Sequence, residues 1–124
     1  MITIDRAHEM LEQIGAEFPE EFFEDLNGGI SLLPQAKISP HARRNDLYTM
    51  GEYRRDVMGR YIYIYFGSFQ RVYGHLSEED FYEELRSTVA HEFTHHLESL
   101  AGERGLEIKD EEDLMDYFRR NERG

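Results

Sequence analysis

Apolar residues recur three or four positions apart near the start of the chain. Ile4, Ala7, Leu11 and Ile14 follow this spacing, and Thr3 precedes them as an N-cap residue. The pattern predicts a helix over residues 3–17. Pro19 then either ends that helix or opens a short second one over residues 20–26.

A second and longer apolar stripe lies near the other end of the chain. Val89, Phe93, Leu97 and Leu100 share one helical face, and the segment Ser77–Asp80 has the form of a capping box. We therefore expect a long helix from residue 77 to about residue 101, ended by glycines at 102 and 105. Residues 110–120 are acidic at the start and basic at the end, which predicts a final helix.

Two segments between these helices have the composition of strands. Residues 60–66, Arg-Tyr-Ile-Tyr-Ile-Tyr-Phe, are β-branched and aromatic, and we expect Gly67 to stop this strand. Residues 30–33 follow an Asn-Gly-Gly turn signal and end at Pro34, which predicts a short strand. Residues 35–59 have weak periodicity, so we expect a loop with one short strand near residues 47–53.

The composition narrows the class of protein. The chain has 124 residues, 26 of them acidic and 14 basic, and its formal net charge is −12. We expect one domain over residues 1–124 and no nucleic-acid partner, because nucleic-acid-binding domains carry a basic face. The absence of cysteine excludes a disulfide scaffold and a thiolate zinc finger. No apolar run reaches 18 residues and the first residues lack a signal-peptide pattern, so we expect no membrane partner and a cytoplasmic protein.

Positive charge is concentrated in one segment. Residues 37–60 hold six basic residues against three acidic ones, while the rest of the chain is strongly acidic. This segment is either a solvated loop or a basic wall that meets an acidic group on a substrate or on the rest of the fold.

The long helix contains the motif His91-Glu92-Phe93-Thr94-His95, which is H-E-x-x-H. Histidines four residues apart lie one turn apart on the same helical face, so both imidazoles can bind one Zn²⁺. Glu92 is rotated by about 100° from His91, so it misses the metal but can reach a water molecule bound to it. This arrangement suits metal-assisted hydrolysis with Glu92 as general base. Zinc is favoured over manganese and cobalt by ligand type and availability.

The remaining histidines do not extend the motif. His96 lies one residue away from the ligand face, so we interpret it as a packing or supporting residue. His8, His41 and His75 have no partner pattern, and we interpret them as structural or surface residues.

The segment Val89–His96 resembles the catalytic helix of the compact bacterial zincin-like metallopeptidases, the minimal zincin family. The resemblance covers most of the chain and includes residues 18–22, 27–30, 47–53 and 61–67. It implies an α+β, minimal zincin-like fold, in which a small mixed sheet packs on a long active-site helix with flanking helices. It also implies zinc peptidase chemistry on a peptide or protein substrate.

The third metal ligand is open between several acids. The family pattern continues H-E-x-x-H-x-x-G-x-x-D, but here Glu98 and Ala101 stand at the Gly and Asp positions. An insertion of residues 98–105 would place Asp110 at the family's acid. The chain length allows this placement. The helix extends about 13 Å beyond the histidines before it ends, and residues 106–110, if extended, span about 16 Å, enough to return to the level of the metal. We therefore predict His91, His95 and Asp110 as metal ligands, with Glu112, Glu98 and Glu103 as alternatives. Asp110 could instead cap the final helix.

Three functions are compatible with these residues. The first is a zinc-dependent metallopeptidase of the HExxH type, a hydrolase with Glu92 as its base. The second is a non-catalytic metal-binding regulatory or interaction protein on a zincin-like fold, and the third is an acidic interaction protein without metal. The intact Glu92 favours the first, because a purely structural metal site has no need of a general base.

Overall fold

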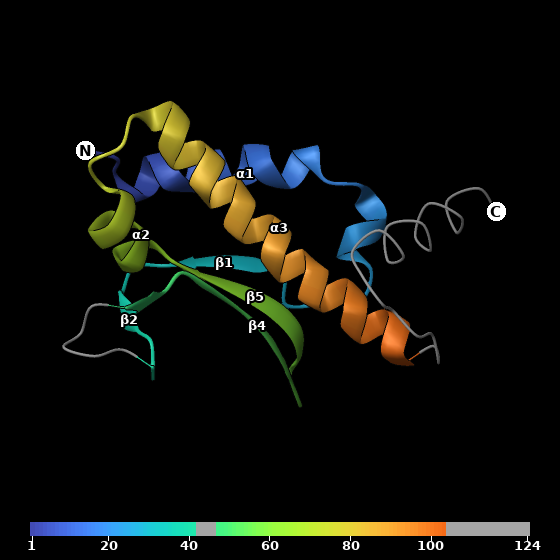
Figure 1. Ribbon diagram of the computed structural model, residues 1–124. Coiled ribbons are helices and arrows are strands. Elements are labelled where there is room, and N and C mark those ends of the chain that lie inside the picture. Colours follow the sequence, from blue (N-terminus) through green and yellow to red (C-terminus); the bar gives the residue numbers. More distant parts are fainter. Residues whose placement is uncertain (42–46, 104–124) are drawn as a thin grey trace.

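We describe a computed structural model of the chain, in which residues 1–41 and 47–103 are described. Its helices and strands succeed one another along the chain as shown in Figure 1. The helices are α1 (Ile4–Glu17), the 3₁₀ helix η1 (Glu20–Phe23), α2 (Phe66–Tyr73) and α3 (Glu78–Glu103). The strands are β1 (Ile30–Leu33), β2 (Lys37–Ile38), β3 (Tyr48–Thr49), β4 (Gly51–Asp56) and β5 (Gly59–Tyr65).

The main sheet is small and mixed, with the order β1-β5-β4. β1 runs parallel to β5, with Ile30 opposite Ile62, and β4 and β5 form an antiparallel hairpin. A second, two-stranded sheet pairs β2 with β3. The two edges of the main sheet are therefore β1 and β4 among the residues described.

α1 and α3 cover one face of the main sheet (Figure 1). Ile62 and Ile64 of the central strand are fully buried, as expected for alternate residues that face the helices. The core beneath them is aromatic and aliphatic, and its most buried large side chains are Met10, Ile14, Phe69, Phe81, Leu85, Phe93, Leu97 and Leu100. These contacts confirm the α+β class with a small mixed sheet packed on a long helix.

The predicted ends of the long helices are close to those observed. The Thr3 side chain accepts a hydrogen bond from the N–H of Arg6 at 3.1 Å and caps α1. The Ser77 hydroxyl accepts from the N–H of Asp80 at 3.2 Å and caps α3. α3 continues through Gly102 to Glu103, so Gly102 does not end it. The predicted helix over residues 110–120 lies outside the described residues.

The middle of the chain contains more secondary structure than the sequence predicts. In the described part of residues 35–59, β3 and β4 occupy the region of the one strand predicted near residues 47–53, and β2 is an additional strand that pairs with β3. β5 does end just before Gly67, but Gly67 itself lies in the first turn of α2, a helix that the sequence analysis missed. Its small size is a packing requirement: a Cβ there would lie 2.4 Å from the backbone nitrogen of Ala36. A local pattern does not report such a contact with a distant segment.

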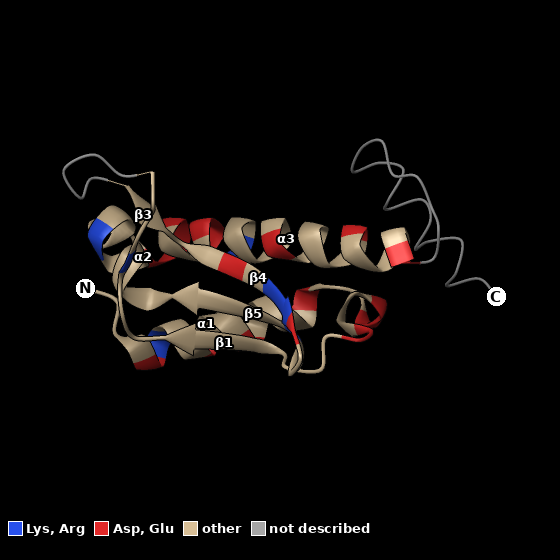
Figure 2. Ribbon diagram, turned by 90° about the horizontal axis from the view of Figure 1, so that it is seen from below, with Lys and Arg blue, Asp and Glu red and all other residues tan. Residues whose placement is uncertain are grey.

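The basic segment meets acids of the same fold. Lys37 and Arg54 both pair with Glu52, and Arg55 and Arg60 both pair with Glu103 at the end of α3. Figure 2 shows the basic and acidic residues side by side along β4. Arg55 and Arg60 therefore contact the rest of the fold, whereas Lys37 and Arg54 pair within the segment, and Arg43 and Arg44 lie outside the described residues. None of the described helices is long and apolar enough to cross a membrane.

Candidate active site

The apolar stripe of α3 fixes the orientation of the H-E-x-x-H motif. Phe93, inside the motif, is 1% exposed and packs its ring against those of Phe18 and Phe23 at 5.0 Å, and of Phe22 at 5.8 Å. These contacts dock α3 on α1 and η1. His91 and His95 consequently emerge on the opposite side of the helix, where both are exposed.

The two imidazoles face each other across one helical turn. Their Nε2 atoms are 3.1 Å apart and their ring centroids 4.6 Å apart. Two nitrogens bound to one tetrahedral zinc at about 2.0–2.1 Å lie about 3.3 Å from each other. The observed separation fits a shared metal ion, and it also allows one imidazole to donate its Nε2–H to the other.

Both histidines line an open cleft of about 660 Å³ between α3 and β4. The strand contributes Gly51, Glu52 and Tyr53, and the helix also contributes Glu92, Glu98 and Ser99. A second hollow of about 420 Å³ shares Gly51, His91 and Glu92 and continues toward Tyr73 and Glu84. His91 therefore lies where the two hollows meet along one side of α3, and His95 lines the larger one.

Glu92 lies in the wall of this cleft and is only 6% exposed. Burial raises the pKa of its carboxyl above the ordinary 4.5. The nearby His91 and His95 and a hydrogen bond from the backbone N–H of Tyr53 lower the pKa and offset part of this effect. A carboxylate with a raised pKa holds a proton more tightly than an exposed one. Glu92 therefore lies in the cleft wall beside the two imidazoles, with a carboxyl pKa that burial raises.

Gly51 allows β4 to approach Glu92. A Cβ at this position would lie 3.1 Å from Thr88, 3.2 Å from Ile64 and 3.3 Å from the Cγ of Glu92. These distances are shorter than ordinary van der Waals contacts, so a larger residue would push the strand away from the helix. Gly51, Glu52, Tyr53 and Ser99 line the cleft but are not among the site residues that the sequence predicts; the first three lie in a segment noted only for its likeness to the family.

The acids considered as third ligands have different surroundings. A carboxylate oxygen of Glu98 lies 4.0 Å from the Nδ1 of His95, on the side of the ring away from His91. Glu103 pairs with Arg55 and Arg60. Asp110 and Glu112 lie outside the described residues, and within residues 1–41 and 47–103 no group of three or more potential ligands is arranged to hold a metal. Catalytic zinc sites generally have three protein ligands, so the described part of the chain supplies two.

His96 does not face the cleft, in agreement with its interpretation as a packing residue. It is fully buried, its Nε2–H donates to the carbonyl of Glu24 at 2.7 Å, and its Nδ1 accepts from the hydroxyl of Tyr53 at 2.9 Å. The carbonyl can only accept, which fixes the tautomer. Burial lowers the pKa of His96 below 6.5, so the ring is neutral and links α3 to β4 and to the end of η1.

The comparisons with known proteins add a related structure. No protein-family model matches the chain, and no curated protein matches it. A solved structure of a conserved hypothetical protein from Thermus thermophilus is similar, with a TM-score of 0.70 and 33% sequence identity. The match covers 82% of this chain and 99% of that one.

Proposed function

The chain belongs to the same family as the conserved hypothetical protein from Thermus thermophilus, and we propose a function from the residues of this chain. We propose that the protein is a zinc-dependent metallopeptidase in which His91 and His95 hold the metal and Glu92 is the general base. One observation carries the proposal: two imidazole nitrogens 3.1 Å apart and a buried carboxylate line the same cleft. Asp110 is the proposed third ligand.

The chemistry divides between the metal and the chain. A zinc ion held by the two histidines would lower the pKa of a water molecule and polarise the substrate carbonyl. Glu92 would accept the proton of the attacking water and deliver it to the leaving nitrogen. Glu92 is held between α3 and Gly51 of β4, in the wall of the cleft that the two imidazoles line.

The shape of the cleft supports an extended peptide as substrate. β4 is an edge strand of the main sheet, and it runs along the cleft opposite His91 and His95. The second hollow lengthens this path toward Tyr73 and Glu84. An extended chain can hydrogen-bond to the edge of a strand while its scissile bond faces the helix.

Turnover of a mixed peptide library, followed by mass spectrometry, tests the proposal. We expect zinc-dependent cleavage that a chelator abolishes and that Glu92→Gln reduces by roughly 10²–10⁴-fold, the usual contribution of a general base. Glu83→Gln is the matched control, because it removes one exposed acid from the same helix and should leave cleavage unchanged. Zinc bound in the wild type without any cleavage would contradict the proposal and favour a non-catalytic metal-binding protein.

A further inference from the structure

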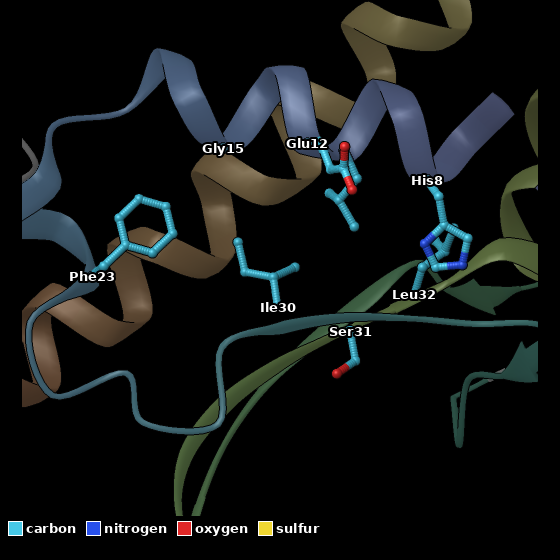
Figure 3. Close-up of a pocket in the computed structure, with 8 residues that line it drawn as sticks. His8, Glu12, Gly15, Phe23, Ile30, Ser31 and Leu32 are labelled. Atoms are coloured by element: carbon cyan, nitrogen blue, oxygen red, sulfur yellow. The ribbon is translucent and has the colours of Figure 1, made fainter. Parts of the chain in front are cut away.

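A groove on the opposite edge of the sheet shares no residue with the active-site cleft. It lies between α1 and β1 and has a volume of about 490 Å³. Figure 3 shows its walls, with His8 and Glu12 reaching down from α1 and Ile30 and Leu32 reaching up from β1. Leu11, Gly15 and Phe23 complete the apolar end.

The backbone of β1 is open along this groove. β1 pairs only with β5 among the described strands, and the N–H of Ile62 donates to the carbonyl of Gly29 at 2.9 Å. Because alternate residues of a strand direct their backbone groups to opposite sides, those of Ile30 and Leu32 point away from β5. An exposed row of such groups is a template for another strand.

The two edge strands of the main sheet differ in charge. β4 has the sequence Gly-Glu-Tyr-Arg-Arg-Asp, with four charged residues, and it lines the active-site cleft. β1 has the sequence Ile-Ser-Leu-Leu, with no charge, no proline and no break in its pairing with β5. The groove therefore combines an apolar wall with an uncharged edge strand, whose short length is its main protection against unwanted pairing.

The lining of the groove specifies the side chains of an occupant. Gly15 leaves one end open, since a Cβ there would meet only Phe23, at 3.9 Å. Glu12 and His8 lie toward the other end, with Glu12 the acid of the lining. From Gly15 to Glu12 the helix rises about 4.5 Å, whereas residues i and i+2 of a strand are roughly 6.6 Å apart, a difference that a long Lys or Arg side chain can span.

We infer that this groove binds an extended peptide segment of a partner protein as an additional strand beside β1. The segment carries an apolar side chain, which enters the space beside Gly15 and Phe23, and two residues later a Lys or Arg that pairs with Glu12. β1 is only four residues long, so the backbone bonds are few and the two side chains provide most of the selectivity.

NMR titration of the ¹⁵N-labelled full chain carrying Glu92→Gln tests the inference without cleavage of the probe. The probe is a capped octapeptide of alternating Thr and Val, with Leu at one groove-facing position and Arg two residues later. We expect shift changes at Gly15, Ile30 and Leu32, and slower hydrogen exchange of the Ile30 and Leu32 amides. Replacing the Arg of the probe by Glu, or a pairing residue by Pro, should weaken binding.

Two pairs of variants locate the binding. Gly15→Leu should weaken it by about tenfold to hundredfold, the equivalent of one buried apolar side chain, whereas Gly15→Ala should not. Glu12→Gln should remove the preference for Arg over Glu, whereas Glu9→Gln, outside the groove, should retain it. No change at β1 with millimolar probe, or changes confined to Gly51 and Tyr53 in the cleft, would overturn the inference. Protection of the β1 amides that rises with protein concentration alone would also overturn it, and would assign this edge to a second copy of the chain.

Discussion

The hydrogen bonds of His96 provide a quantitative test of how the active-site strand is held. His96→Phe preserves the size of a fully buried ring but removes the bonds to the Glu24 carbonyl and the Tyr53 hydroxyl. Each bond contributes about 1 kcal/mol net, and leaving polar groups in a poorly solvated place costs about 1–3 kcal/mol more. We expect the free energy of unfolding to fall by about 3–5 kcal/mol.

The partner residue shows whether the effect comes from this pair. Tyr53→Phe removes only the hydroxyl and should cost about 1 kcal/mol in the wild type. In the background of His96→Phe the same change should cost almost nothing, because its hydrogen-bond partner is already gone. Urea unfolding of the four proteins, monitored by circular dichroism, gives the coupling energy. Additive losses would refute the proposed link between α3 and β4.

The pH dependence of stability gives a second readout of the same residue. Burial lowers the pKa of His96 below 6.5, so the unfolded chain binds a proton at higher pH than the folded chain does. The contribution of the neutral ring is present above pH 6.5 and is lost as the pH falls through the folded-state pKa. His96→Phe should therefore flatten the decline in stability below pH 6.5. An unchanged acid limb would contradict this assignment.

Three further measurements address the metal site. A chelator should remove zinc but lower the melting temperature only slightly, because Phe93 and the rest of the hydrophobic core do not depend on the metal. Global unfolding on addition of the chelator would favour a structural zinc site instead. Asp110→Asn and Asp110→Ala should both weaken zinc binding in isothermal titration calorimetry if Asp110 is a ligand, whereas unchanged affinity in both would exclude it and favour Glu112. In the metal-free protein Glu92→Gln should raise the melting temperature at pH 7, because burial raises the pKa of this carboxyl and its ionisation therefore opposes folding above pH 4.5. The gain in melting temperature should shrink toward pH 4, and a gain that is constant with pH would contradict the electrostatic cause.

The parts of the fold that the sequence predicts well are those with local signals. The caps at Thr3 and Ser77 and the apolar stripe of α3 act within one helix, so sequence spacing reports them. β2 and β3 depend on pairing with each other across ten residues, and neither two-residue strand has a pattern of its own. The sequence does not predict α2, because Gly67 is interpreted as the end of a strand. In the structure Gly67 is required because the backbone of Ala36 leaves no room for a side chain.

The candidate site likewise contains residues that local sequence spacing predicts and residues that only tertiary contacts bring to it. His91, Glu92 and His95 lie within two turns of one helix, so their spacing alone brings the imidazoles together. Gly51 and Tyr53 reach Glu92 only through the hairpin of β4 and β5, and their role follows from tertiary contacts. The choice of Asp110 rests on an inferred insertion and on chain length, and it remains a prediction.

Anomalous diffraction at the zinc edge, from crystals of the full chain soaked in zinc, tests the central claim most directly. The account predicts one peak between His91 and His95, about 2.0–2.1 Å from each Nε2 atom, with a carboxylate of Asp110 as the third protein ligand. A third ligand other than Asp110 would change the ligand set but retain the site. The absence of a peak between the two imidazoles, with zinc present elsewhere or nowhere in the crystal, would contradict the assignment of this cleft as a metal-dependent active site.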